Sequence, residues 1–464
     1  MKRKIIYLSI LASILFVSVS KANSMPTYEI GDRGVNSVTL LEEGCPIEVQ
    51  KEVLTFDLQE FPKEYYETAK ELKSYMGEVT AEYIFYNPTD EEIRAKLAFP
   101  FGNKPTYASY QIAGELAGEW WKKDITVDGK SVEPTLRFTY FPDVEFDAYK
   151  EREKLINGYM EDEFYKPDLL VKKYSYDIQT DTKEDTYVEA SLILDMEKTE
   201  SKILTKGCIR GWDGSKKKGT IAVDVENSQV EFYVLGENDF ELEWKFRDWE
   251  EETDVDGKAT LNGIEEMSFE EFVSANLDEI VDGTKADKYN ACVMYLKDCE
   301  QEKGIVADCY IEYLRDSLMY WYEYEVMYPP GETVKNSVTA PIYPAVEAAY
   351  EPPIYEYKYL LSPAKLWSDF GEMEIRIHTP FYLTDSSIKG FEKTENGYRL
   401  MRKGLPGKEF EFVLSESEHP KMDRDIISYR LTVFFYFIGI PVLFVGGIAF
   451  IFFRIHRKRK KERS

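Results

Sequence analysis

The chain has 464 residues and a formal net charge of −27 at pH 7, and its two ends are basic, so the residues between them are more acidic still. This charge excludes nucleic acid as a partner and disfavours direct adhesion to anionic lipids or wall polymers. Five cysteines in a chain of this length do not indicate a disulfide framework, although Cys299 and Cys309 flank a turn and could pair.

Residues 1–22 have the pattern of a secretory signal peptide. Lys2, Arg3 and Lys4 precede an apolar run, and Ser20-Lys21-Ala22 is a small-x-small cleavage site. An uncleaved membrane anchor is the alternative interpretation, and both interpretations predict an exported protein.

Residues 35–235 are expected to form a β-sandwich-like domain. Apolar and polar residues alternate from Val79 to Phe99 on both sides of a polar loop that contains Asn87-Pro88-Thr89, which predicts an antiparallel hairpin. Further strands are expected at 125–132 (with Asp-Gly at a bend), 136–141, 187–194, 221–225 and 230–234, the last two as a hairpin with a turn at 227–228. The charged stretch 146–173 lacks this alternation and is expected to be a helical insertion.

A helical region is predicted over residues 264–316. Ser268 and Glu271 have the spacing of a capping box, and an apolar stripe at helical spacing follows them. A second helix is expected from Ala286 to Lys303, ending at Gly304.

A second, membrane-proximal β-domain is expected over residues 318–416, with a hairpin around Pro329-Pro330-Gly331-Glu332. Residues 417–430 read as a polar stalk. The predicted fold class is therefore mainly β with helical insertions (α+β): two β-sandwich-like domains followed by one C-terminal transmembrane helix.

That helix is predicted at residues 431–453, which carry no charge and are long enough to cross a hydrocarbon core of about 30 Å. The basic tail 454–464 follows directly and places this end in the cytoplasm. We therefore expect a single-pass protein of the cell membrane with its N-terminus outside, and a partner subunit within the membrane is possible.

Catalytic motifs are scarce. The chain has three histidines, one of them in the basic tail, and it has no HExxH, GxSxG, P-loop or CxxC pattern. A pair of carboxylates could still act as in a glycosidase, because Asp and Glu are abundant. Trp120-Trp121 and the tyrosines at 343, 350, 355, 357 and 359 could stack on sugar rings, but aromatic residues on strands are more often core.

The candidate metal site lies in EETDVDGKATLNGIEE, residues 251–266. Read as a calcium loop, it places Asp254 and Asp256 at the third and fifth positions, but Gly263 stands where the bidentate Glu belongs. A turn between strands fits this stretch better. Asp254 and Asp256 remain calcium candidates, and no other cofactor is expected.

The run Y-x-F-x-N-P-T and then L-x-F-P-F, from Tyr83 to Phe101, is followed by ITVDGKSV at 125–132. This pattern resembles uncharacterised extracytoplasmic β-sandwich proteins of Gram-positive bacteria and is distantly similar to VIT-type domains. The resemblance implies a β-sandwich at a bacterial cell surface and carries over no catalytic residue. The Lys-, Glu-, Ile- and Tyr-rich composition also favours a bacterial source.

These features together predict a non-enzymatic cell-surface protein. Its acidic, β-rich ectodomain is expected to bind an unknown protein or glycan or to serve structurally in the envelope. The alternative is an extracellular hydrolase that acts on glycan or peptide through a carboxylate pair.

Overall fold

The computed structural model describes residues 35–36, 39–40, 44–59, 77–102, 124–142, 147–180, 188–195, 201–205, 209–213, 218–224, 229–237, 242–248, 253–278, 281–302, 305–306, 311–342, 344–347 and 349–422. The predicted signal peptide, the apolar run 431–453, the basic tail, Trp120-Trp121 and Cys309 lie outside these ranges. Within them, no helix is both long and apolar enough to cross a membrane.

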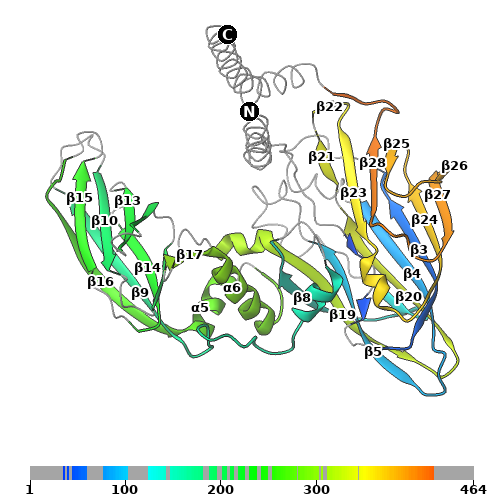
Figure 1. The fold of residues 1–464 in the computed structure, drawn as a ribbon, viewed down its shortest axis with the longest axis horizontal. Coiled ribbons are helices and arrows are strands. Elements are labelled where there is room, and N and C mark those ends of the chain that lie inside the picture. The colour runs from blue at the N-terminus through cyan, green and yellow to red at the C-terminus, as the bar shows by residue number, and fades with distance from the viewer. Residues whose placement is uncertain are drawn as a thin grey trace, which may run out of the picture.

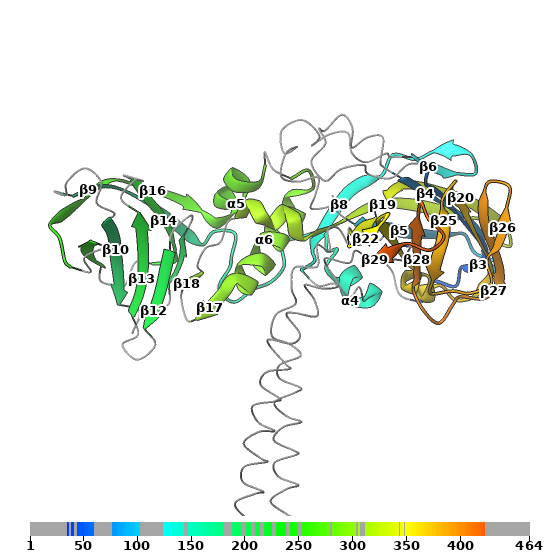
Figure 2. The same cartoon turned by 90° about the horizontal axis from the view of Figure 1, so that it is seen from above.

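A larger β-body and a smaller β-lobe lie at the two ends of the molecule, with helices between them (Figures 1 and 2). The described part of the chain is mainly β, which confirms the expected fold class at that level.

The described part of the body contains four sheets. Its eight-stranded sheet has the order β26 (Glu392–Thr394), β27 (Gly397–Lys403), β24 (Phe370–His378), β3 (Glu48–Asp57), β4 (Gly77–Tyr86), β20 (Thr333–Ile342), β6 (Asp124–Val127) and β7 (Lys130–Ser131). A four-stranded sheet has the order β2 (Thr39–Leu40), β5 (Ile93–Gly102), β19 (Leu318–Tyr328) and β8 (Thr135–Tyr140).

The remaining sheets of the body are smaller. One consists of β1 (Val35–Asn36), β23 (Ile354–Leu360), β28 (Phe410–Ser415) and β25 (Tyr382–Ser386), with β21 (Ala345–Glu347) paired to β23. The other pairs β22 (Tyr350–Glu351) with β29 (Lys421–Met422), so the first residues of the expected stalk 417–430 are tied to the body. A 3-10 helix, η3 (Ser362–Leu366), follows β23.

The described part of the lobe forms two sheets. The larger has the order β16 (Gly257–Ser268), β9 (Leu170–Thr180), β14 (Gln229–Leu235), β11 (Lys202–Thr205), β18 (Ile305–Val306) and β17 (Glu300–Glu302). The smaller has the order β12 (Ile209–Asp213), β13 (Lys218–Asp224), β10 (Val188–Asp195) and β15 (Leu242–Asp248). The helices are α4 (Ala148–Glu153), α5 (Phe269–Leu277), α6 (Lys285–Cys299) and the 3-10 helix η2 (Ile311–Ser317).

The lobe is an insertion within the body. Strands β8 and β19 are antiparallel neighbours with Tyr140 directly opposite Leu318, so the chain leaves and re-enters the body at adjacent points. Strands before residue 142 pair with strands after residue 318, for example β4 with β20 and β3 with β24. The expected division into domains 35–235 and 318–416 is therefore wrong, because it was drawn from chain order and these pairings join distant segments.

Three of the expected hairpins are also wrong. Strands β4 and β5 form where alternation predicts them, but β4 pairs with β3 and β20 whereas β5 pairs with β2 and β19. Strands β19 and β20 separate in the same way, and so do β13 and β14. In each case the two consecutive strands belong to different sheets, because period-two alternation determines which side chains face a core but not which strand lies alongside.

Asn87 connects the loop between β4 and β5 with the loop between β19 and β20. Its side-chain Nδ2 donates to the carbonyls of Glu91 (2.8 Å) and Tyr328 (2.9 Å), and the N–H of Gly331 donates to the Asn87 carbonyl (3.1 Å). Asn87 is fully buried. The Asn-Pro-Thr motif is thus a structural link between loops far apart in the sequence.

Other local predictions are confirmed. Strands β6 and β7 pair as a hairpin around Asp128 and Gly129, which have φ values of 49° and 74° and so supply the left-handed turn that Asp-Gly favours. Helix α5 begins at the predicted capping box, with the Ser268 side chain accepting from the Glu271 N–H and the Glu271 side chain accepting from the Ser268 N–H. Helix α6 ends at Cys299, a few residues before the predicted stop.

The expected helical insertion 146–173 is mostly not helical. Among the described residues 147–173, only α4 is an α-helix, and β9 already begins at Leu170. In between, the Asp162 carboxylate accepts from the N–H groups of Phe164 and Tyr165, both at 2.9 Å. This side chain satisfies the backbone in a turn, which removes the advantage of a helix.

Candidate functional site

The candidate site lies on the outer face of the eight-stranded sheet, at its interior strand β24. Met373, Ile375 and Ile377 point into the core, so the alternate residues of the strand point outward. Among these outward residues, Glu374 and Arg376 take part in a cluster of charges that links β24 with its two neighbours, β3 and β27.

Glu374 binds three cationic side chains. Its Oε1 accepts from the Nε of Arg376 and from the Nε of Arg399, both at 2.8 Å, and its Oε2 lies 3.2 Å from Lys51 Nζ. The Glu374 side chain is only 2% exposed. Burial alone would raise the pKa of Glu374, but hydrogen bonds from Arg376, Arg399 and Lys51 lower this pKa to about 2.

The two arginines lie directly opposite each other on β24 and β27. Like charges in that position repel, and the carboxylate of Glu374 between them offsets the repulsion. Their side chains are 38% and 47% exposed. Within the described chain, the Nη atoms of Arg376 and Arg399 make no hydrogen bond or ion pair, and Glu392, which lies opposite Arg399 in register, does not pair with it.

This geometry presents two guanidinium groups with oriented, unused donors. The four side chains that bind one another, Lys51, Glu374, Arg376 and Arg399, together carry two net positive charges, and the exposed Glu372 and Glu392 lie beside them on the same face. Guanidinium groups match the oxygens of carboxylates, phosphates and sulfates, often through two parallel hydrogen bonds. They do not exchange protons near neutral pH, so the arrangement suits oxyanion binding better than acid–base catalysis.

A row of hydroxyl groups continues from the arginines across the sheet. Thr55 lies opposite Arg376, Thr80 lies opposite Thr55, and Thr339 lies opposite Thr80. The hydroxyls of Thr80 and Thr339 are 3.0 Å apart and hydrogen-bonded. The face beside the arginines is therefore polar, with donors and acceptors held by paired strands.

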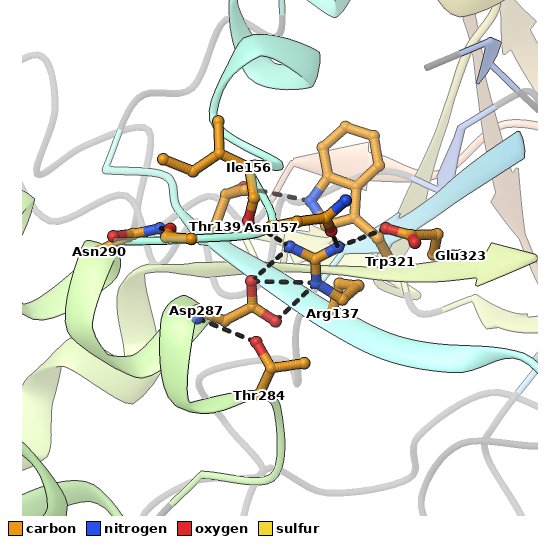
Figure 3. A network of polar contacts seen from close by, with 10 residues as sticks. Arg137, Thr139, Ile156, Asn157, Thr284, Asp287, Asn290, Trp321 and Glu323 are labelled. Atoms are coloured by element: carbon orange, nitrogen blue, oxygen red, sulfur yellow. Dashed lines mark hydrogen bonds and ion pairs between the residues drawn. The ribbon is translucent and has the colours of Figure 1, made fainter. Parts of the chain in front are cut away.

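A second polar network is buried where the body meets the inserted segment (Figure 3). Arg137 of β8 donates from Nε to both carboxylate oxygens of Asp287 on α6, at 2.9 and 3.1 Å, and from Nη2 to the Ile156 carbonyl at 2.8 Å. It also forms an ion pair with Glu323 of β19. The Arg137 side chain is 3% exposed and that of Asp287 2%, so this network joins elements rather than receiving a ligand.

The sequence-predicted calcium residues do not come together with other ligands. Asp254 and Asp256 are both exposed in the connection between β15 and β16, where Val255 N–H donates to the Phe246 carbonyl at 3.1 Å. No group of three or more His, Cys, Asp or Glu side chains is placed to hold a metal ion within the described ranges. Residues 257–266 of this stretch belong to strand β16, and calcium binding by Asp254 and Asp256 stays a prediction.

The tyrosine run is mainly core. Tyr355, Tyr357 and Tyr359 are at most 4% exposed, and the Tyr357 ring stacks on Phe412 with centroids 5.1 Å apart. These three rings are therefore closed to a sugar ligand.

An open cleft of about 350 Å³ lies over the five-stranded sheet, and its polar groups bind one another. Lys358 Nζ lies 3.7 Å from a Glu411 oxygen, and the Asp385 carboxylate lies 2.7 Å from Lys389 Nζ. Ser387 Oγ accepts the Glu411 N–H at 2.9 Å. Because these groups already bind one another, the cleft offers a ligand fewer free hydrogen-bonding groups than the arginine pair does.

Sequence reasoning did not single out the arginine pair. Glu374 and Arg376 alternate with Met373, Ile375 and Ile377, and this pattern indicates that they share one face, but Arg399 belongs to a strand whose register the sequence does not specify. The detectable signal is Glu-x-Arg on an alternating strand, because a glutamate so close to an outward arginine can orient it.

No family model matches the chain, and no curated protein matches it. Among solved structures, it is similar to a proposed nutrient binding protein from Legionella pneumophila, with 9% identity and a TM-score of 0.33, over 82% of this chain and 70% of that one. A likeness at this level carries no argument about fold or function. The resemblance to extracytoplasmic proteins of Gram-positive bacteria stays a prediction.

Proposed function

We propose that this protein is a non-enzymatic binding protein of the cell surface, held in the membrane by residues 431–453. Its ligand carries an oxyanion group that Arg376 and Arg399 bind on the outer face of the eight-stranded sheet. The observation that carries this proposal is the unused Nη donors of two opposed arginines, oriented by the buried Glu374.

The acidity of the rest of the molecule narrows the ligand class. A local positive pair within a chain of net charge −27 attracts one oxyanion group at short range, whereas the surrounding charge repels extended polyanions. The ligand is therefore a small molecule, or a partner that presents a single carboxylate, phosphate or sulfate to the site.

The hydrolase alternative is less well supported. A carboxyl group that acts as a general acid near neutral pH needs a raised pKa. Asp162, Glu271, Glu374 and Asp385 have shifted pKa values, and all four are lowered. These shifts favour carboxylates that accept hydrogen bonds over carboxylic acids that donate protons.

Calorimetric titration of the full chain in detergent tests the binding site. Inorganic phosphate, sulfate and acetate serve as probes, and their ranking separates tetrahedral oxyanions from carboxylates. We expect the double variant Arg376→Gln/Arg399→Gln to bind the preferred probe at least tenfold more weakly, a loss of about 1.4 kcal/mol. The matched control is Lys403→Gln, which removes a positive charge from the same strand and should leave the affinity unchanged.

Two results would count against the proposed site. One is equal affinity of the double variant and the parent chain for the preferred probe. The other is the absence of binding to all three probes. Cell-surface placement is tested separately with intact cells, in which a protease should reach the ectodomain but not a tag placed after residue 464.

A further inference from the structure

The strand β16 lies at the outer margin of the lobe (Figure 1) and has one open edge. It pairs with β9 on one side, and no strand of the described chain pairs with its other side. Such an edge presents a row of backbone donors and acceptors to a further strand.

Two apolar side chains of β16 are exposed beside this open edge. Leu261 and Ile264 are each 45% exposed, although they lie opposite Tyr176 and Tyr174, which belong to the core between the two sheets of the lobe. Apolar residues on a core-facing side of a strand are normally covered. Here the smaller sheet does not cover them. The side chains of a strand added to the open edge would bury part of both Leu261 and Ile264.

A β-bulge places these two side chains on the same face. The register with β9 shifts between Leu261 and Gly263, so one extra residue, Asn262, separates the two halves of the strand. Without that residue, positions three apart would point to opposite faces. Leu261 and Ile264 therefore form one apolar patch at the middle of the strand.

We propose that β16 pairs antiparallel with β16 of a second copy of this chain, which joins the two six-stranded sheets across a two-fold axis. The register that overlaps the complete strand places Gly257 opposite Ser268 of the other copy. The same register places Leu261 opposite Ile264 of the other copy, and Ile264 opposite its Leu261. The register that overlaps the two β16 strands completely is therefore the same register that pairs Leu261 with Ile264 of the other copy.

Charge complementarity supports a second copy as the occupant. Lys258 lies opposite Gln179 and Glu265 lies opposite Lys173. These two residues of β9 alternate with the core-facing tyrosines, so Lys258 and Glu265 point to the face of the sheet away from the apolar patch. In the proposed register, Lys258 of each copy is diagonal to Glu265 of the other, within reach of a cross-strand ion pair. The two-fold axis makes this contact twice.

Mass measurement of the full chain in detergent tests the assembly. We expect two copies per particle for the parent chain and one for Leu261→Asp/Ile264→Asp. The matched control is Met327→Asp, because Met327 is a strand residue of the body that is 47% exposed, and this variant should keep two copies. Circular dichroism of each variant verifies that these exposed substitutions leave the fold intact.

Disulfide trapping tests the register. Thr260 lies opposite Glu265 of the other copy, so a mixture of Thr260→Cys and Glu265→Cys chains should form a covalent dimer under mild oxidant. Either variant alone should form no more than the parent chain, because two copies of one position are about 17 Å apart along the strands, beyond the roughly 7 Å Cα separation that a disulfide tolerates.

The results that would overturn the proposal are specific. A single copy per particle for the parent chain would exclude the dimer. A dimer that survives Leu261→Asp/Ile264→Asp would place the interface elsewhere. Trapping by Thr260→Cys alone would show another register, and binding of a different protein's strand at this edge would show another occupant. The anion-binding test uses another sheet and is unaffected by any of these outcomes.

Discussion

Glu374 illustrates how a single buried residue organises the candidate site. Its carboxylate holds two arginines that would otherwise repel each other, and their hydrogen bonds keep its pKa at about 2 rather than its ordinary 4.5. Because the folded-state pKa is lowered, the stabilisation is complete above about pH 4.5 and is lost as the pH falls toward 2.

Glu374→Gln tests this linkage. We expect a loss of about 3 kcal/mol in the free energy of unfolding at pH 7, because three cations lose their shared buried acceptor. We also expect a smaller loss of stability between pH 4.5 and pH 2 than in the parent chain. Urea unfolding at a series of pH values measures both. Glu372→Gln is the control, since this exposed glutamate lies on the same strand and face. Equal pH dependence of parent and Glu374→Gln would contradict the assignment.

At the scale of elements, Arg137 joins β8, β19 and α6 through one buried guanidinium group (Figure 3). Helix α6 starts at Lys285, and the side chain of the preceding Thr284 caps it by accepting the Asp287 N–H at 3.1 Å. This cap places Asp287 in the first turn of the helix, facing Arg137. The junction therefore depends on a helix start and a strand that are far apart in the sequence.

Arg137→Met should cost about 3–5 kcal/mol, because it leaves Asp287 buried without its cation. Adding Asp287→Leu should recover part of that loss, since an apolar pair avoids the desolvation of two charges. Denaturant unfolding of both single variants and the double variant measures the coupling. Additive losses would mean that the two side chains do not act as a pair.

At the scale of the whole molecule, the lobe interrupts a body whose sheets are complete without it. Phe141 N–H donates to the Ser317 carbonyl at 2.8 Å, directly beyond the β8–β19 pairing, so the two ends of the insertion already lie side by side. A two-residue Asn-Gly turn could close them as a hairpin.

Replacing residues 142–316 with Asn-Gly should leave a body that unfolds cooperatively, at lower stability because α6 no longer packs on β8. Near-ultraviolet circular dichroism and thermal unfolding test this. Residues 35–235 alone provide the comparison and should not fold, because β4 lacks β20 and β5 lacks β19. A folded 35–235 fragment would contradict the insertion topology.

Local patterns predicted much of the secondary structure. The strands at 79–86 and 93–99 follow from alternation, and the capping box at Ser268 marks the start of α5. Such local patterns can be recognised in the sequence because they depend on residues that are near neighbours in the chain. This holds for the burial of one face of a strand and for the capping of the first N–H groups of a helix.

The arginine site could be predicted only in part. Alternation places Arg376 and Glu374 on one face, but the contact with Arg399 depends on the β24–β27 register and the contact with Lys51 on the parallel pairing of β24 with β3. The helical interpretation of 146–173 failed because the Asp162 turn competes with a helix of similar composition.

The sequence by itself determined the alternating strands β4 and β5, the start of α5, the faces that these elements bury, and the acidic character of the molecule. Tertiary structure decided that β4 and β5 enter different sheets, that the lobe is inserted between β8 and β19, and that Asn87 links two loops. The physical reason is that the spacing of apolar residues along a segment indicates which side chains are buried. The choice of partner strand depends instead on which distant segments pack together to form the core.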